Sequence, residues 1–404
     1  MQTHLDSQVL LMNSKKLSIM FVAGDPSGDE HAAAVIKRLK EILPEARLFG
    51  IGGPCMQENG FEALLPFEPF NRMGIAEVLL HLPFFLKAKL FLIKQLTDTK
   101  PAALVCVDYP GFNIPLMKAA RRLGIPVVWY IGPQVWAWKK KRAEVLGNYA
   151  SFIAVVFPFE KEYFTPYPAP VEFVGHPLVE LLDREQQVVA GTHRPALEKN
   201  GPVRLALVPG SRPQEIAHLL PPMIDAAISL KTTYPSMSVA VSRARGLSAE
   251  LFGAQTGRFE KRFPGCITVS DAPLFELVHD SDCAIVTSGT ATLQTALAGV
   301  PLVVAYRTSA VTYSFLKSMV RLPYIGLPNI VADERIVPEC IQHDATGEKL
   351  AAEVRRFIED KEHYAITVQN LSRLRMKLGT KKPSVEVASA IRAIALRSTQ
   401  AATR

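Results

Sequence analysis

The sequence predicts an α/β protein built from two doubly wound parallel sheets. Short apolar runs rich in β-branched residues recur along the chain, turn residues follow them, and helical stretches separate most of them. Continuous apolar strands that alternate with helices are typical of parallel sheets covered on both faces. A polar, weakly periodic stretch over residues 183–202 divides the strands into two sets, and 404 residues exceed one ordinary core.

The predicted strands are 17–23, 103–107, 126–131 and 152–156 in the first set, and 203–208, 238–241, 283–286 and 301–305 in the second. Helices are expected over 114–123, 215–231 and 290–298. From about residue 345 two or three amphipathic helices follow without a strand. We therefore expect an N-terminal domain over 1–185, a C-terminal domain over 200–345, and terminal helices over 346–404 that close one half or cross back to the N-terminal domain or a partner chain.

The formal net charge of +8 favours an anionic partner, which is nucleic acid, anionic lipid or a phosphorylated small molecule. The five cysteines are scattered without a C-x-x-C pair, so free thiols in a reducing cytoplasm are expected rather than a zinc site or disulfides. The apolar run after Lys15 and Lys16 is short and soon turns polar, which favours a first strand over a signal peptide. The sequence contains no run of 18 or more uncharged apolar residues, so no transmembrane helix is predicted.

Ligands of open parallel sheets bind beyond the carboxyl ends of the strands, so the turns there are the candidate sites. The first turn reads "AGDPSGDEHAA": Gly24 and Gly28 allow close backbone approach, and Ser27 or Asp29 can cap the next helix. Two acids, with Asp25 as the first, suit sugar hydroxyls better than phosphate. A plain capped turn explains the stretch equally well.

The second turn, "VCVDYPGFNIP", places Asp108 at the end of an apolar strand. A partly desolvated carboxylate at a strand tip can act as a general base toward a sugar hydroxyl. The alternative is that Asp108 caps the helix that starts near Asn113.

The third turn lies within "VVWYIGPQVWAWKKKR", the stretch that holds every tryptophan of the chain. Trp129 lies inside the strand and is expected in the core. Trp136 and Trp138 follow the loop around Pro133 and precede four basic residues, so they can line a ligand cleft or pack inside while the bases form a solvated face.

Two turns of the second half carry signals for an anion. In "LVPGSRPQEI", Gly210 and Ser211 open a helix, Arg212 adds a fork of donors, and Glu215 can form a capping box with Ser211. In "TSGTATLQTAL", small hydroxyl residues and a glycine open another helix. Two such helix N-termini would hold a nucleotide diphosphate without a metal.

The segment 73–93, "MGIAEVLLHLPFFLKAKLFLI", is apolar on too many sides for an ordinary surface helix. Pro83 is expected to split it in two. It is either a buried helix pair or a surface that meets lipid, and we expect Phe84 and Phe85 to insert into a membrane interface in the second case.

The motifs occur in an order that closely resembles lipid A disaccharide synthases, over residues 17 to about 360. They include "AGDPSGDEHAA", "NRMGIAEVL", "VDYPGFN", "GPQVWAWKKKR", "FPFEKEYF", "PGSRPQEI", "SGTATLQTAL" and "LPYIGLPNIVADERIVPE". The resemblance implies a GT-B fold, with two Rossmann-like halves facing a cleft. It implies metal-independent, inverting transfer from UDP-2,3-diacylglucosamine to 2,3-diacylglucosamine 1-phosphate, with no cofactor.

The resemblance implies that Asp108 is the catalytic base, with acceptor and acyl chains on the N-terminal domain and UDP-sugar on the C-terminal one. The substrate contacts are expected at Gly24, Asp25, Ser27, Gly28, Asp29, Met73, Gly74, Asn113, Gln134, Trp136 and Trp138. The nucleotide contacts are expected at Gly210, Ser211, Arg212, Glu215, Ser288, Gly289, Thr290, Ala291, Gln294 and Asn329.

The chain departs from the family pattern at several places. Asp25 replaces the usual glutamate, Gly111 replaces a second acid after Asp108, Gly132 replaces a small hydroxyl residue, and Gln294 replaces a glutamate that resembles the ribose-binding carboxylate of GT-B enzymes. Glutamine can still hydrogen-bond a ribose hydroxyl as a neutral partner.

The expected location is cytoplasmic, peripherally attached to an anionic inner-membrane surface, and a homodimer is left open. Other functions remain: another GT-B UDP-sugar transferase, a sugar-nucleotide epimerase, or a sugar-nucleotide or lipid binding protein that has lost catalysis. The acyl-suited segment 73–93 argues against an epimerase, and Asp108 and Arg212 argue against lost catalysis. A nucleic-acid binder fits the charge but lacks a known module.

Overall fold

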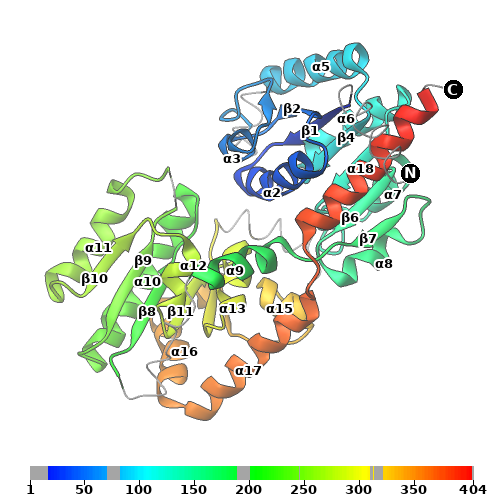
Figure 1. The fold of residues 1–404 in the computed structure, drawn as a ribbon. Coiled ribbons are helices and arrows are strands. Elements are labelled where there is room, and N and C mark those ends of the chain that lie inside the picture. Colours follow the sequence, from blue (N-terminus) through cyan, green and yellow to red (C-terminus); the bar gives the residue numbers. More distant parts are fainter. Residues whose placement is uncertain are drawn as a thin grey trace. The chain divides into compact units, whose positions relative to one another are not determined.

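The computed structural model describes residues 17–70, 82–188, 201–244, 246–309, 313 and 322–402. The chain forms two compact units (Figure 1). Unit 1 comprises Met1–Pro177 and Thr380–Arg404, and unit 2 comprises Leu178–Gly379. Residues 346–404 are therefore divided between the units rather than grouped in one region.

Unit 1 contains a sheet with the order β3-β2-β1-β4-β5-β6-β7, in which all neighbours are parallel. Its strands are β1 (Ser18–Ala23), β2 (Arg47–Ile51), β3 (Glu62–Ala63), β4 (Ala103–Val107), β5 (Val127–Tyr130), β6 (Phe152–Val155) and β7 (Val171–Phe173). The direction of winding reverses between β1 and β4, which creates a crevice at their carboxyl ends.

Helices cover both faces of this sheet. They are α2 (Pro26–Ile42), α3 (Pro54–Glu58), α5 (Leu82–Thr99), α6 (Pro110–Arg122), α7 (Lys141–Tyr149), η1 (Pro158–Glu160), α8 (Lys161–Phe164) and α18 (Pro383–Ala402). Helices α5, α6 and α7 share one core cluster with the sheet. Helix α18 packs against α2 and β4 on the other face (Figure 1).

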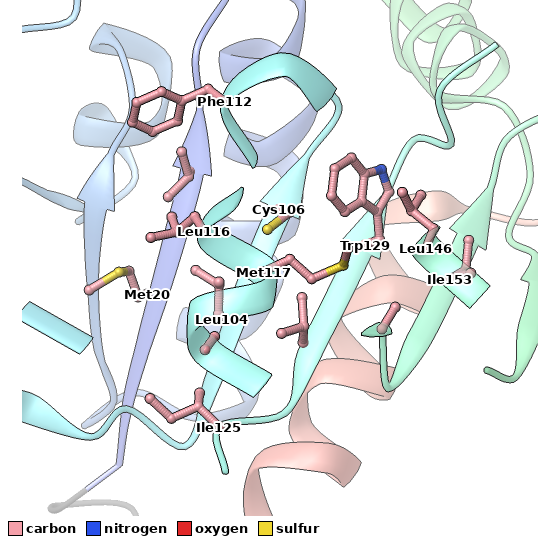
Figure 2. Packing of buried hydrophobic residues seen from close by; sticks show 14 of the residues in the cluster. Met20, Leu104, Cys106, Phe112, Leu116, Met117, Ile125, Trp129, Leu146 and Ile153 are labelled. Atoms are coloured by element: carbon pink, nitrogen blue, oxygen red, sulfur yellow. The ribbon is translucent and has the colours of Figure 1, made fainter. Parts of the chain in front are cut away.

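Side-chain alternation along the strands divides their residues between the two faces. Met20, Leu104 and Cys106 point into the cluster that also contains Leu116 and Met117 of α6 (Figure 2). Trp129 is fully buried in the same cluster, so the prediction that this tryptophan belongs to the core is confirmed. Burial of such side chains stabilises the fold by about 1.5–3 kcal/mol each.

Unit 2 repeats the architecture with the order β10-β9-β8-β11-β12-β13, again all parallel. Its strands are β8 (Arg204–Val208), β9 (Ser238–Ser242), β10 (Ile267–Ser270), β11 (Cys283–Thr287), β12 (Leu302–Tyr306) and β13 (Glu339–Ile341). Winding reverses between β8 and β11, so the crevice of this sheet lies after those two strands.

The helices of unit 2 are α9 (Pro177–Val188), which begins on the last residue of unit 1, α10 (Pro213–Thr233), α11 (Glu250–Arg262), α12 (Leu274–His279), α13 (Thr290–Leu297), α15 (Leu327–Ala332), η3 (Gln342–Asp344), α16 (Gly347–Glu359) and α17 (Lys361–Leu378). Helices α10, α11 and α16 share the main core cluster with the sheet. Helix α13 packs against β11, β12 and α17.

The predicted fold class of two doubly wound parallel sheets is confirmed, and every predicted strand is present. The sequence missed β2, β3, β7, β10 and β13, which are short or polar. In β2, Gly50 has φ +137, and a Cβ there would lie 2.1 Å from the Phe21 carbonyl oxygen, so a glycine sits where a β-branched residue would have indicated a strand. No helix among the described residues is long and apolar enough to cross a bilayer.

Candidate active site

Asp108 follows β4 at the reversal point of the unit 1 sheet, and its backbone N–H donates to the Tyr130 carbonyl at the end of β5 (2.9 Å). Asp108 and Tyr109 both have left-handed backbone conformations, with φ of +41 and +51. Such conformations cost about 1–3 kcal/mol each and are concentrated at functional sites. The backbone at the strand tip that carries this carboxylate is therefore strained.

The surroundings of Asp108 bring its pKa close to neutrality. Burial and the charge of Asp25 raise the pKa of Asp108 to about 7, while the Tyr109 backbone hydrogen bond and the Arg142 charge lower it by less. A carboxyl group with a pKa near neutral pH can take a proton efficiently from a reacting hydroxyl.

Two neighbours hold Asp108 in place. The Asn113 Nδ2 donates to the carbonyls of Asp108 (2.8 Å), Val22 (3.2 Å) and Val107 (3.4 Å), which ties the ends of β1 and β4 together. The Tyr109 hydroxyl donates to the Phe70 carbonyl (3.2 Å). A Cβ on Gly24 would lie 2.6 Å from the Tyr109 ring, so Gly24 is needed to admit this ring.

The first turn divides into internal and exposed positions. Asp25 caps α2 by accepting from the Gly28 N–H (3.3 Å), and a Cβ on Gly28 would lie 2.7 Å from that carboxylate. Asp29 is 2 % exposed and accepts from three N–H groups at the start of α3, those of Gly53, Cys55 and Met56. Ser27 is exposed and lies 3.1 Å from the His31 ring. Asp29 therefore holds α3, whereas Asp25 and Ser27 remain at the surface of the turn.

The two later tryptophans have different environments. Trp136 is 7 % exposed, donates from Nε1 to Glu160 (3.0 Å), and packs edge-on against Phe157 and Phe159. Trp138 is 36 % exposed and precedes α7. Of the two tryptophans, only Trp138 has a ring that a ligand can reach from solvent. The Gln134 side chain is also exposed.

Glu160 was missed as a site residue from the sequence, although it belongs to the quoted motif "FPFEKEYF". It is 1 % exposed and accepts from the Val156 and Phe157 N–H groups (3.1 Å each) as well as from Trp136. Burial, with a smaller contribution from the Asp108 charge, raises the pKa of Glu160 to about 7. Glu160 therefore joins Trp136 to the backbone after β6 through its buried carboxyl group.

In unit 2, the turn after β8 is organised by Glu215. Its carboxylate accepts from the N–H groups of Ser211 (3.1 Å) and Arg212 (3.3 Å) and from the Arg212 guanidinium (2.9 Å). Gly210 has φ +116, and a Cβ there would lie 2.4 Å from Glu215, so only glycine fits this turn. The Arg212 side chain is 56 % exposed.

The turn after β11 lies beside it, because β8 and β11 are paired. Gly289 and Thr290 are exposed at the start of α13, and Ala291 and Gln294 are half-buried. The hydroxyl of Ser288 donates to the Ile325 carbonyl (2.9 Å), and that of Thr292 to the Gly289 carbonyl (2.7 Å). Exposed backbone and an arginine fork thus meet at one sheet edge, an arrangement suited to a diphosphate.

Asn329 is fully buried, and its side chain hydrogen-bonds the backbone of the loop before β13. Its Oδ1 accepts from the Ile336 and Val337 N–H groups, and its Nδ2 donates to the Val337 carbonyl and to Glu339. Met73 and Gly74 lie outside the described residues. Across the part of the chain that is described, no group of histidine, cysteine or acidic side chains is arranged to hold a metal ion.

The expectation that Phe84 and Phe85 point outward to insert into a membrane interface was wrong. Phe85 is 9 % exposed and Phe84 is partly buried, and both rings pack edge-on against Phe70 (5.7 and 5.1 Å). Instead, α5 exposes Leu82 (45 %), Leu86 (45 %) and Leu90 (64 %), which lie four residues apart on one stripe of the helix. Pro83 lies in the first turn of α5, where proline is tolerated.

Known proteins resemble this chain over nearly its whole length. The family model described as lipid-A-disaccharide synthetase matches residues 19–394. The lipid-A-disaccharide synthase of Geobacter sulfurreducens is 38 % identical over 379 residues, which cover 92 % of this chain and 96 % of the relative. That of Myxococcus xanthus is 35 % identical over 374 residues, with coverage of 92 % and 96 %.

Two solved structures share the fold. A calicheamicin glycosyltransferase has a TM-score of 0.60 at 14 % identity and covers 94 % of this chain and 98 % of its own. The UDP-GlcNAc 2-epimerase of Neisseria meningitidis has a TM-score of 0.58 at 13 % identity, with the same coverage. The GT-B fold is thereby confirmed. On the near full-length matches to the family model and to the two synthases, the chain belongs to the lipid-A-disaccharide synthase family.

Proposed function

We propose that this glycosyltransferase joins UDP-2,3-diacylglucosamine to 2,3-diacylglucosamine 1-phosphate. The acceptor 6-hydroxyl oxygen attacks C1 of the donor sugar, the bond from C1 to the UDP oxygen breaks, and the hydroxyl proton passes to Asp108. The products are UDP and a β-1,6-linked disaccharide 1-phosphate, with inversion at C1.

The observation that carries the proposal is the position and pKa of Asp108. It stands at the reversal point of the unit 1 sheet, and its pKa of about 7 suits a general base at neutral pH. Asp25 and Ser27 from the neighbouring strand end, together with Gln134, offer polar side chains to sugar hydroxyls. The buried Asp29, Asn113 and Trp136 support these residues from inside.

In unit 2, the two paired strand ends receive the UDP diphosphate. Backbone N–H groups at the start of α13 and the Arg212 fork supply the positive partners. Gln294, half-buried one turn into α13, is placed to bind a ribose hydroxyl as a neutral group. No metal is required for this mode of diphosphate binding.

We expect Arg212→Lys to weaken UDP binding and slow turnover, because a point charge cannot reproduce a two-pronged hydrogen bond. The arginine is also oriented by Glu215, which a lysine would reach differently. Titration with UDP measures the effect, and wild-type turnover should survive excess EDTA. Loss of activity with EDTA that magnesium restores would contradict metal-independent transfer.

Both substrates carry acyl chains, so the enzyme must work at a lipid surface. We propose cytoplasmic, peripheral attachment to the inner membrane through the Leu82, Leu86 and Leu90 stripe, supported by Lys87, which is exposed on the same helix. Inserted apolar area contributes ~25 cal/mol per Å², and each lysine near an anionic surface about 1 kcal/mol.

Replacing Leu82, Leu86 and Leu90 together by serine is expected to reduce co-sedimentation with vesicles that contain phosphatidylglycerol. Turnover of long-chain substrates should fall, while UDP affinity stays unchanged. The matched control replaces Ile366 and Met376, which are 48 % and 72 % exposed on α17, by serine. Equal vesicle binding by both variants would show that the α5 stripe is not the docking surface.

One assay tests the function directly. Purified protein is incubated with the UDP-diacylglucosamine donor and the monophosphate acceptor, and UDP release and the tetra-acyl disaccharide are followed. An epimerase would convert the donor without acceptor, and a binding protein would release no UDP. Membership of the synthase family favours neither of these alternatives.

A further inference from the structure

A basic platform lies after β5, next to the strand that ends at Asp108. The Lys139 Nζ lies 4.4 Å, and the Arg142 guanidinium carbon 5.1 Å, from the centre of the Trp138 ring. The ring is 36 % exposed, and Lys139 has φ +50, so the backbone turns there to bring both cations to one indole. We call Trp138, Lys139 and Arg142 the tryptophan platform.

The cations of the platform form no close ion pair within the described residues, and the Arg142 charge acts on Asp108 only from a longer distance. Neither Lys139 nor Arg142, nor Lys140 and Lys141 between them, forms an ion pair with a carboxylate in that part of the chain. Of these four cations, Lys139 and Arg142 share the exposed indole, and together they attract an anion to that point. Arginine also presents a fork that matches phosphate oxygens, and an indole face can cover a sugar ring.

The platform and Asp108 are close enough to serve one ligand. Strand β5, after which the platform lies, pairs with β4, and the Asp108 N–H donates to the Tyr130 carbonyl at the end of β5 (2.9 Å). The Arg142 charge also acts on the Asp108 carboxylate. The acceptor of the proposed reaction carries its 1-phosphate on C1 and its reacting 6-hydroxyl on the carbon attached to C5. Both C1 and C5 adjoin the ring oxygen, so the rigid ring limits the distance between the two groups. An enzyme that holds the phosphate at one point therefore aims the hydroxyl at another.

We propose that the tryptophan platform binds the phosphate monoester of the acceptor and thereby directs its 6-hydroxyl toward Asp108. Arg142 and Lys139 hold the phosphate oxygens, and Trp138 covers the sugar. This assignment rests on the proposed function, and it explains why the cations accompany an exposed indole rather than a carboxylate. The donor diphosphate has its own turns in unit 2.

The test compares the acceptor with 2,3-diacylglucosamine, which lacks the phosphate. For Arg142→Gln we expect the Kd and KM of the phosphorylated acceptor to rise roughly 10–100-fold, the size of a lost hydrogen bond to a charged group. The Kd of the dephosphorylated acceptor should be the same as in wild type, whereas kcat should fall alike for both acceptors, because the Arg142 charge helps to lower the pKa of Asp108. That second acceptor also reports whether the variant is folded.

Lys141→Gln is the matched control, because it removes the same charge from an exposed neighbour that does not contact Trp138. It should leave the Kd of the phosphorylated acceptor within about twofold of wild type, as surface charges away from the ligand contribute little. An equal rise of the acceptor Kd in both variants, or an equal rise of Kd for both acceptors in Arg142→Gln, would overturn the assignment.

Lipid headgroups are the other source of phosphate. On vesicles of phosphatidylcholine and phosphatidylglycerol we expect Arg142→Gln and Lys141→Gln to bind alike. Selective loss of vesicle binding by Arg142→Gln, with unchanged Kd for detergent-solubilised acceptor, would assign the platform to the membrane instead. If wild type binds the acceptor through Arg142 but releases no UDP, the result supports phosphate binding by the platform and contradicts the proposed sugar transfer.

Discussion

Asp108→Asn is expected to slow sugar transfer by ~10²–10⁴-fold, the usual cost of removing one positioned general base. Asparagine keeps the size of the side chain but cannot accept the hydroxyl proton. It also tolerates the left-handed backbone at φ +41, so the strand tip should fold normally. The loss should appear in kcat, while UDP binding in unit 2 remains unchanged.

The pH dependence gives an independent check. Because the base must be deprotonated, kcat/KM should rise as pH increases through about 7, the value to which burial and Asp25 raise the pKa of Asp108. The pKa read from this rise describes Asp108 and Glu160 together, since the two carboxyl groups interact. Near-normal turnover by folded Asp108→Asn, or a flat profile from pH 6 to about 8, would remove Asp108 from this role.

Glu160→Ala is expected to lower the free energy of unfolding by about 3 kcal/mol or more. The change leaves the Trp136 indole N–H and the Val156 and Phe157 backbone N–H groups without their acceptor, and each buried unpaired group costs about 1–3 kcal/mol. Thermal unfolding should show a drop of several degrees, at about 2–4 °C per kcal/mol. Glu162→Ala, an exposed position on α8, is the control and should be near neutral.

The stability difference between wild type and Glu160→Ala should depend on pH. The pKa of Glu160 is raised from 4.5 to about 7 in the folded protein, so between these values the folded state holds a proton that the unfolded chain has released. Rising pH therefore lowers the stability of wild type relative to the variant in this window. A difference that grew with pH would contradict the neutral, buried form of this acid.

The positions of the turns could be predicted because they depend on local signals. Apolar runs, glycines and cap residues mark where β1, β4, β8 and β11 end, and parallel strands then bring those ends to one edge. Asp25 and Asp108, which follow β1 and β4, were both singled out as candidate site residues by this argument.

The direction of individual side chains could not be predicted, because it depends on partners far away in sequence. Trp136 turns inward since Glu160, 24 residues later, offers it an acceptor. Helix α5 is apolar on several sides, so its sequence does not fix its rotation. The aromatic cluster around Phe70 selects Phe84 and Phe85 for the interior and leaves the leucine stripe outside.

Unit 1 is made from both ends of the chain, and this affects the order in which the protein can mature during translation. Helix α18 buries Val387, Ala388, Ile391 and Ala395, and it packs on α2 and β4, which leave the ribosome hundreds of residues earlier. The first sheet is synthesised first, but the face that α2 covers in part is completed only when the last helix emerges, whereas unit 2 is continuous and can close before it. A nascent chain of this protein therefore lacks the cover that α18 gives to α2 and β4 until the end of its synthesis, and a chain that ends before residue 383 never gains it.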